Sequence, residues 1–462
     1  MENAQNDFRS QYKAEADAFM SAIETDKRLV KQDVMGSLAH CAMLGEYGVI
    51  DQAEAESLKA ALSQIFFEIS EDKLKVEGAP NLFAFFDAEL EKRLGAVSQK
   101  LNLGRSFADR MALDLRMYVR ESVEEVNSLL KALVLQLCEI SGVGCRMLMP
   151  AYTHGRKAAP TTLAHTLMSY AEKFMRDIER LIDAEKRANF MPLGAMTGTG
   201  TLLPISRKRV AEILKFPAVT QNGQDAVSDR DFVVEYIAAC ALILSHVSTL
   251  ADDFSRYSSE EYGYFYLSDA FNKTCKSSPV KVNPTALELL RARAARANGA
   301  LAAVFTALKG APGNAADMTE CLPPLFAAED AVKESVGILL PLLYEIAFDE
   351  ARMQKGVADG FTTAGDLTTY LTEKGMLPAD AYRMTADIIA CCRENNKRLD
   401  TLPYETYAAF SNLFETDINQ LMRPKNAVRF RRHEGDPGEG AVKNEIRHLK
   451  HRLLRLLPDP KG

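Results

Sequence analysis

Side chains suited to acid–base chemistry and anion binding gather in five short segments of this 462-residue chain. The candidates for proton transfer among them are His154 and Cys275. An imidazole titrates near neutral pH, and a thiol is more acidic than a hydroxyl. No segment alone specifies a function. The segments are 32–44 (QDVMGSLAHCAML), 103–110 (LGRSFADR), 151–162 (AYTHGRKAAPTT), 222–232 (NGQDAVSDRDF) and 275–299 (CKSSPVKVNPTALELLRARAARANG).

Together, the order and spacing of these segments resemble the argininosuccinate lyase family of the aspartase/fumarase superfamily, across nearly the whole chain. The superfamily's loop signature, SSxMPxKxNP, aligns with CKSSPVKVNP at 275–284, which keeps PxKxNP and lacks the leading serine pair. Other stretches close to the family pattern are 192–199 (PLGAMTGT), 225–232 (DAVSDRDF) and 361–371 (FTTAGDLTTYL).

The resemblance implies an all-α fold with a central long-helix bundle, which four subunits assemble into a twenty-helix core. Each active site of such a homotetramer is shared between three subunits, which supply the regions 103–110, 151–162 and 275–284. The reaction is elimination from a succinyl group. A base removes a proton from carbon, the electrons rest on the neighbouring carboxylate, and a C–N or C–O bond breaks to leave fumarate. No metal or organic cofactor is implied.

The carbanion places extra negative charge on a carboxylate, so cations and donors must be aimed at it. By resemblance, the dicarboxylate is held by Lys281, Asn283, Ser106 and Thr153. Lys281 and Asn283 could instead only shape a loop before the helix-starting Pro284. Further substrate-binding candidates in the same segments are Arg105, Asn222 and Arg230.

The residues that would transfer protons match the family pattern less fully than the residues that would bind the anion. His154 aligns with the family's histidine, and Glu288 with the glutamate that orients it. A carboxylate bonded to imidazole fixes its tautomer. The position of the family's serine base is Cys275, whose pKa the neighbouring Lys276 could lower. The alternatives are that Ser277 or Ser278 serves as base, or that no base remains.

Departures from the family pattern cluster where the leaving group would bind. Loss of polar partners disfavours a zwitterion, because buried charge left unpaired is costly. We therefore expect a C–N lyase that eliminates fumarate from an N-substituted aspartate or related succinyl compound, or that catalyses the reverse addition. We do not expect its substrate to be argininosuccinate. The rivals are a non-catalytic structural or regulatory homologue and an argininosuccinate lyase with a remodelled pocket. The departures are Ala22, Phe83, Phe107, Ala108, Arg156, Gly223, Asn314, Thr319 and Leu322.

The elements that position these groups are predicted to be long helices, because apolar residues recur with helical periodicity. Apolar residues recur at three and four residues from Leu163 to Leu181, and 111–141, 233–254 and 329–352 carry similar long patterns. Gly and Pro predict loops at 192–204, 277–284 and 310–313. A linker at 433–440 precedes a basic amphipathic helix, which we expect to dock on the body of the protein. We expect three domains, at 1–107, 108–355 and 356–462.

Composition limits the partners and the compartment. The formal net charge of −7 gives no broad basic face, so nucleic acid is not expected. Eight scattered cysteines without paired spacing indicate reduced thiols rather than disulfides or zinc ligands. The polar N-terminus lacks the pattern of a secretory signal, and apolar stretches such as 236–244 fall short of a membrane span. We therefore expect a cytoplasmic protein that does not bind membranes.

Overall fold

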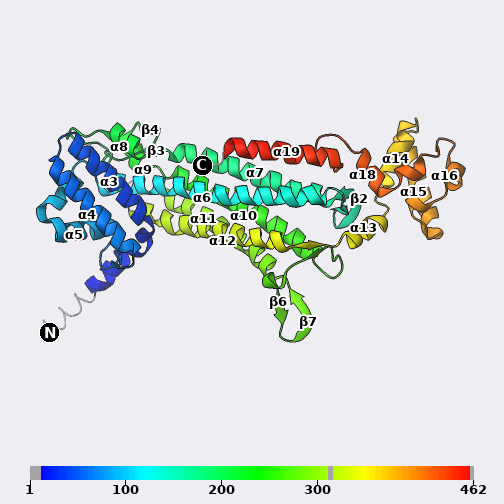
Figure 1. The fold of residues 1–462 in the computed structure, drawn as a ribbon, viewed down its shortest axis with the longest axis horizontal. Helices are drawn as coiled ribbons and strands as arrows, with labels where there is room; N and C mark the ends of the chain where they lie inside the picture. Colours follow the sequence, from blue (N-terminus) through cyan, green and yellow to red (C-terminus); the bar gives the residue numbers. More distant parts are fainter. Residues whose placement is uncertain (1–11, 311–315, 458–462) are drawn as a thin grey trace. The chain divides into compact units, whose positions relative to one another are not determined.

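The computed structural model describes residues 12–310 and 316–457, and the described chain is dominated by helices (Figure 1). This confirms the predicted all-α class. The α-helices are α2 (Ile23–Asp26), α3 (Val30–Glu46), α4 (Gln52–Ser70), α5 (Leu82–Leu94), α6 (Phe107–Gly144), α7 (Leu163–Ala188), α8 (Arg207–Ile213), α9 (Gly223–Ser228), α10 (Asp231–Tyr257), α11 (Thr285–Leu308), α12 (Leu322–Glu345), α13 (Glu350–Ala358), α14 (Ala364–Glu373), α15 (Pro378–Glu394), α16 (Tyr404–Phe410), α17 (Ile418–Leu421), α18 (Pro424–Phe430) and α19 (Glu439–Leu456).

Short strands form two-stranded pairs between the helices. The antiparallel pairs are β1 (Leu148–Thr153) with β2 (Arg156–Thr162), β5 (Phe265–Tyr266) with β8 (Ala347–Phe348), and β6 (Lys273–Cys275) with β7 (Ser278–Asn283). Strands β3 (Phe190–Met191) and β4 (Ala218–Val219) are parallel. The 3₁₀ segments are η1 (Lys27–Leu29), η2 (Gly95–Asn102), η3 (Asp269–Phe271), η4 (Ala316–Cys321) and η5 (Leu399–Thr401).

The chain divides into two compact units. Unit 1 contains the residues through Val126 together with Arg180–Ala241 and Ala295–Val332. Unit 2 contains Asn127–Glu179, Leu242–Ala294 and the residues from Lys333 onward. Both units draw on the long helices, so they do not follow chain order. The three consecutive domains expected from the sequence remain a prediction.

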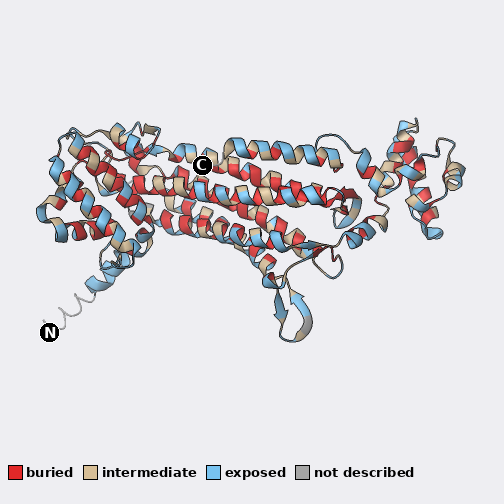
Figure 2. Cartoon of the chain, viewed as in Figure 1, coloured by how far each residue is buried: buried red, intermediate tan, exposed pale blue. Residues whose placement is uncertain are grey.

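The long apolar patterns correspond to helices with one buried face (Figure 2). In α7, the periodic residues from Leu163 to Leu181 are at most 2% exposed, which confirms the predicted stripe. The pattern at 329–352 is not one helix, because α12 ends at Glu345. Residues Ala347–Phe348 pair with β5, and the Asp349 side chain then accepts a hydrogen bond from Arg352 N at the start of α13.

Two helices are longer and more apolar than the sequence analysis predicted. By length and composition alone, α6 and α10 could each cross a membrane, contrary to the expectation that every apolar stretch is too short. Within their most apolar 18-residue windows, 44% and 56% of the residues are buried inside the chain.

The C-terminal helix α19 docks on its own unit, as expected. Its apolar face buries Val442, Leu449 and Leu453. On its polar side, Arg452 donates to Glu172 at 3.1 Å and to Glu179 at 2.9 Å, both on α7. Of the predicted linker at 433–440, residues 433–438 connect α18 to α19, whereas Glu439 and Gly440 already belong to α19.

Candidate active site

The hairpin β1–β2 presents Thr153 and His154 at its tip. Thr153 pairs with Arg156, leaving His154 and Gly155 as a two-residue turn with φ of 52° and 70°. Positive φ at both central residues is the geometry of a type I′ turn, which histidine tolerates better than most side chains. Thr153 and His154 are both exposed. Local backbone geometry thus holds the proposed acid out toward solvent.

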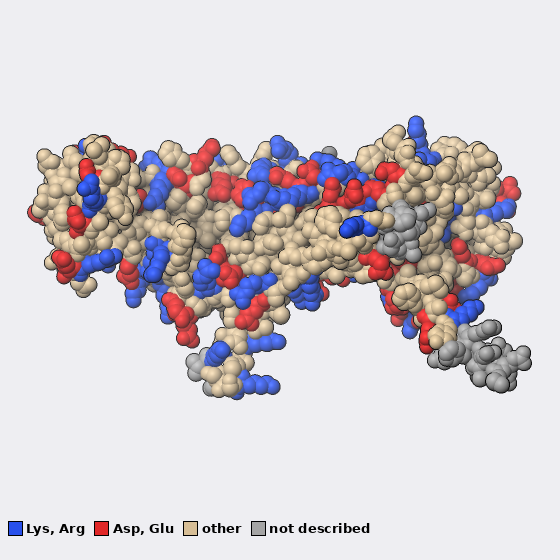
Figure 3. Space-filling model, turned by 180° about the vertical axis from the view of Figure 1, so that it is seen from behind, with Lys and Arg blue, Asp and Glu red and all other residues tan. Residues whose placement is uncertain are grey.

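A second hairpin, β6–β7, carries the signature residues. The sequence predicted a loop at 277–284, but Ser278–Asn283 is a strand paired with Lys273–Cys275. The register pairs Cys275 with Ser278, so Lys276 and Ser277 form the turn. The hairpin stands out from the helices of its unit (Figure 1), and Figure 3 shows cationic side chains on it.

The thiol of Cys275 lies in an environment that favours the thiolate. Its Sγ is 3.0 Å from Ser277 Oγ. Hydrogen bonds from the Ser277 side chain and backbone lower the pKa of the thiol, with further help from the Ser278 N–H and the charge of Lys281. These are the effects by which donors and cations activate cysteines. Among the candidate bases Cys275, Ser277 and Ser278, Cys275 is therefore the one whose observed contacts lower its pKa.

The remaining signature residues flank this hairpin. Lys281 is exposed and Asn283 is half-buried at the end of β7. Glu288 is exposed in the first turn of α11, where it lines a cavity of about 510 Å³ together with Val282 and Pro284. Within the described chain, no hydrogen bond joins Glu288 to His154, so the expected acid dyad stays a prediction.

In unit 1, Asp109 organises the segment around Ser106. Asp109 Oδ1 accepts from the backbone N–H of Ser106 at 2.7 Å and from its hydroxyl at 3.2 Å. Its Oδ2 accepts from Gly194 N at 2.9 Å and Met196 N at 2.8 Å. The carboxylate is fully buried, and burial raises its pKa against the effect of these bonds. No role was assigned to Asp109 from the sequence, although it lies three residues after Ser106 in the same segment.

Arg105 points into the protein rather than toward solvent. The side chain is buried and donates to Ser37 Oγ at 2.7 Å and to Asn102 Oδ1 at 3.1 Å. Burial, with the nearby charge of Arg110, lowers the pKa of the guanidinium to about 9. These contacts favour a structural role for a residue that the sequence proposed as a substrate ligand.

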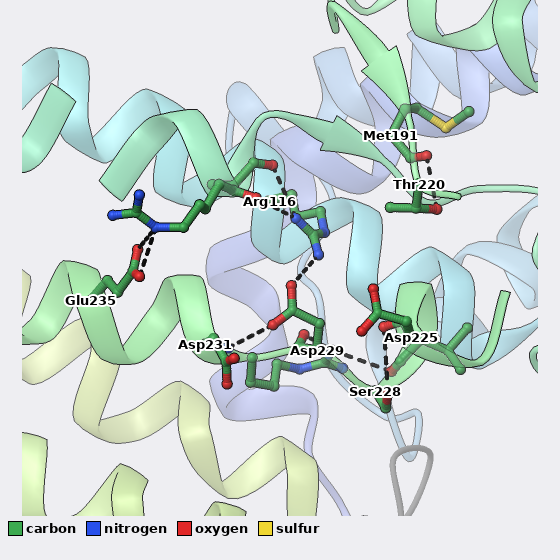
Figure 4. Close-up of polar contacts among 12 residues, drawn as sticks. Arg116, Met191, Thr220, Asp225, Ser228, Asp229, Asp231 and Glu235 are labelled. Carbon is green, nitrogen blue, oxygen red and sulfur yellow. Dashed lines mark hydrogen bonds and ion pairs between the residues drawn. The ribbon is translucent and has the colours of Figure 1, made fainter. Parts of the chain in front are cut away.

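Asn222, Gly223 and Arg230 also have local structural roles (Figure 4 shows the following 225–231 segment). Asn222 Oδ1 caps α9, accepting from Gln224 N at 2.9 Å and Asp225 N at 3.1 Å. A Cβ on Gly223 would lie 2.4 Å from Gly198 O, so a larger side chain would force the backbone to shift. Arg230 is buried, and burial lowers its pKa to about 10.

The departures at Phe83 and Phe107 form a single aromatic contact. Their rings meet edge to face with centroids 5.0 Å apart. The guanidinium of Arg110 lies 4.1 Å from the Phe83 ring centroid and bonds Asp33 at 2.9 Å. Phe83 thus stacks on the buried Arg110–Asp33 ion pair, while the Phe107 ring packs against Phe83 and stays 48% exposed.

The other departures lie elsewhere on the described chain or beyond it. Ala22 precedes α2, and its N–H donates to Pro80 O at 2.8 Å. Thr319 lies in η4, and Leu322 is buried at the start of α12. Asn314 lies outside the described residues.

A cleft of about 1140 Å³ beside the β1–β2 hairpin was not anticipated. Tyr152 and Arg156 line it from the hairpin, opposite Tyr262, Tyr264 and Arg352. The hydroxyls of Tyr152 and Tyr264 are 2.9 Å apart. The aromatic run YGYFY at 262–266 is visible in the sequence. Its contribution to a cleft becomes apparent only from its packing against the β1–β2 hairpin.

The candidate residues belong to different units. Arg105, Ser106, Asn222 and Arg230 lie in unit 1; the remaining candidates, on both hairpins and at the start of α11, lie in unit 2. Among the residues that the structure describes, no group of three or more His, Cys, Asp or Glu side chains is placed to bind a metal ion.

Comparison with known proteins matches nearly the whole chain. A family model described as Lyase matches residues 9–299, and one described as Argininosuccinate lyase C-terminal matches 361–429. The argininosuccinate lyase of Desulforamulus reducens is 38% identical over 440 residues, covering 95% of this chain and 96% of that protein. That of Heliobacterium mobile is 36% identical, covering 94% and 95%.

Solved structures share the fold. An EDDS lyase variant with bound fumarate superposes with a TM-score of 0.83 at 24% identity, covering 93% of this chain and 87% of that one. A 3-carboxy-cis,cis-muconate lactonizing enzyme from Pseudomonas putida gives a TM-score of 0.72 at 15% identity, covering 95% and 99%.

Proposed function

Because the chain belongs to the argininosuccinate lyase-like lyases of the aspartase/fumarase superfamily, we propose that it eliminates fumarate from an N-substituted aspartate other than argininosuccinate. Family and relatives make it a carbon–nitrogen lyase. The substrate and the residue roles are the proposal.

The observation that carries this proposal is the Cys275 hairpin. It combines a thiol of lowered pKa with a nearby lysine on one exposed element. Elimination requires a base to take a proton from carbon and a cation to stabilise the carboxylate that receives the electrons. Cys275 would act as the base and Lys281 as the cation, with Asn283 as a further donor to the carboxylate.

The leaving nitrogen needs a proton, which His154 would supply. Its place at the tip of a tight turn leaves the imidazole free to approach a substrate. Thr153 beside it and Ser106 in unit 1 would bind the carboxylates. As the C–N bond breaks, its electron pair goes to nitrogen with the proton from His154, and the carbon chain leaves as fumarate.

We propose that the working site is assembled in a homotetramer and takes residues from three subunits. This arrangement would supply Glu288 to His154, since the two are not bonded within the described chain. Exposed apolar side chains on the long helices, such as Leu242, Leu289 and Ile338, are available for an interface. Light scattering should give four times the mass of one chain; a monomer at micromolar concentration would exclude the shared site.

The choice against argininosuccinate rests on the joint loss of polar family residues at positions 22, 108, 314, 319 and 322. An arginine moiety would lose polar partners there, and the aromatic pair Phe83–Phe107 adds two further apolar replacements. The opposite candidate, argininosuccinate lyase itself, is favoured by the names of the relatives that are 34–38% identical over nearly the whole chain. A substrate panel that includes argininosuccinate separates the two candidates.

Family membership also decides how the long apolar helices are interpreted. As parts of a lyase with whole-length enzyme relatives, α6 and α10 are core helices of a soluble protein. We propose that this protein is cytoplasmic.

The first experiment follows fumarate absorbance with pure protein, in both directions, using argininosuccinate and fumarate with a panel of amines. Lys281→Met should lower the rate on the order of 10²-fold, because it removes transition-state charge stabilisation. Lys273→Met is the matched control, since this exposed lysine lies on the same hairpin. It should leave the rate within about twofold.

Three results would overturn parts of the proposal. Efficient turnover of argininosuccinate, with kcat/KM of about 10⁴ M⁻¹s⁻¹ or above, would refute the substrate claim. Equal rates for the Lys281→Met and Lys273→Met variants would refute the assigned anion site. If the wild type turns over nothing but binds fumarate calorimetrically through Lys281, the non-catalytic homologue replaces the lyase proposal.

A further inference from the structure

A further cavity in unit 2 lies away from the tips of both hairpins. Its volume is about 590 Å³, and it is bordered by α18, the start of α19 and the base of the β1–β2 hairpin. The lining includes apolar surface from Leu148, Val428 and the buried Cys145. Leu148 and Val428 also belong to one small buried cluster, so this wall is fixed by core packing.

Cationic side chains dominate the rest of the lining. Lys425, Arg429 and Arg432 are exposed at the cavity, and no described carboxylate pairs with them. Arg432 Nε donates only to the carbonyl of Arg429, at 3.3 Å. Like charges held close together raise a positive potential that a bound anion would relieve. The three cations are therefore available to a ligand.

The other cations of the cavity already have partners. Arg431 forms a bidentate bond to Asp366, at 2.7 and 3.0 Å. Arg146 is paired with Glu439 at 3.2 Å, and Glu439 also accepts from Lys443 at 2.7 Å. Among the described lining residues Glu439 is the only acidic one, and these bonds hold its pKa at about 2, well below the usual range. The charge of the cavity thus remains strongly positive.

The combination of an apolar wall with unpaired cations selects a class of ligand. An apolar body would be buried against Leu148 and Val428, while an anionic head would meet Arg429 and Arg432. The start of α19 lines the same space through Gly438 and Gly440, and no side chain caps that helix. Its free N–H groups add to the preference for an anion.

We propose that this cavity binds a small organic anion, with an apolar chain against the wall and a carboxylate or phosphate head on Lys425, Arg429 and Arg432. This site is independent of the proposed lyase reaction. It lies at the base of the hairpin that carries His154 at its tip, since Leu148 and its strand partner Thr162 both line it.

Isothermal titration of the full-length protein tests the proposal with four probes: hexanoate, hexyl phosphate, hexanol and inorganic phosphate. The comparison of hexanoate with hexyl phosphate identifies the head group. Hexanol lacks the charge, and inorganic phosphate lacks the apolar body. Hexanoate or hexyl phosphate should bind at least tenfold more tightly than hexanol and than inorganic phosphate. Equal binding of hexanol, equal binding of inorganic phosphate, or no binding at millimolar concentration would overturn the proposal.

Variants then locate the binding. The double substitution Arg429→Ala/Arg432→Ala should weaken the hexyl anion at least tenfold, whereas Arg383→Ala, an exposed arginine on α15, should leave it unchanged. Ala441→Leu should also weaken binding, because it fills the cavity without removing a cation. If Ala441→Leu lowers the melting temperature, the test relies on the double substitution Arg429→Ala/Arg432→Ala. Unchanged affinity of this double variant for the anion would show that the ligand binds elsewhere.

Discussion

Replacing Asp109 by Ala tests how unit 1 holds Ser106 and the loop at 192–199. The carboxylate accepts from the backbone N–H groups of Ser106, Gly194 and Met196, at 2.7, 2.9 and 2.8 Å. A buried donor without an acceptor costs about 1–3 kcal/mol. Because burial also raises the pKa of Asp109, its removal recovers part of a desolvation cost. We therefore take the low end of the range for each donor, about 3 kcal/mol in total.

Hydrogen exchange measures this loss where it occurs. A local loss of about 3 kcal/mol corresponds to roughly 10²-fold faster exchange. Mass spectrometry of peptides covering 192–199 should show this acceleration in the Asp109→Ala variant. The control is Asp183→Ala, because that exposed residue forms a surface pair with Lys186, at 2.7 Å, and such surface pairs are worth less than about 1 kcal/mol. Unchanged exchange in Asp109→Ala would refute the role given to this carboxylate.

Two further predictions concern pH. The Nε2–H of buried His40 donates to Leu103 O at 2.8 Å, and burial lowers the pKa of the imidazole to about 3. The unfolded chain binds this proton near pH 6.5, so stability should fall as pH drops below that value, by about 2 kcal/mol at pH 5. His40→Gln should flatten the pH dependence of the urea midpoint between pH 7 and 5, and an unchanged slope would contradict this assignment. For catalysis, Cys275→Ser should move the rising limb of the pH–rate profile to higher pH, because it removes a thiol whose pKa is lowered by Ser277 and Lys281. If the rising limb of the Cys275→Ser profile stays at the same pH, another residue acts as the base.

Periodicity alone was enough to predict the long helices. The stripe from Leu163 to Leu181, and the patterns within α6 and α10, are local properties of the chain, because a 3.6-residue repeat already defines a buried face. The docked C-terminal helix was predicted for the same reason. The signature residues at 275–284 also gave the family correctly, since the order of short motifs is read directly from the sequence.

Pairing between distant segments decided the rest. The 277–284 stretch was predicted as a loop from its prolines, but pairing with Lys273–Cys275 makes it a strand. Likewise, α12 ends at Glu345 because Ala347–Phe348 pairs with Phe265–Tyr266, a strand from much earlier in the chain. Strand pairing depends on a partner that no local pattern specifies.

Side-chain direction depended on the tertiary structure in the same way. Arg105 and Ser106 are neighbours in one motif, yet Arg105 turns inward to Ser37, while Ser106 is held by Asp109. The sequence determined which residue types were available for chemistry. Whether each one is used in packing or exposed to a substrate was decided by what lies opposite it, because burial and hydrogen bonding are set by segments far away in the chain.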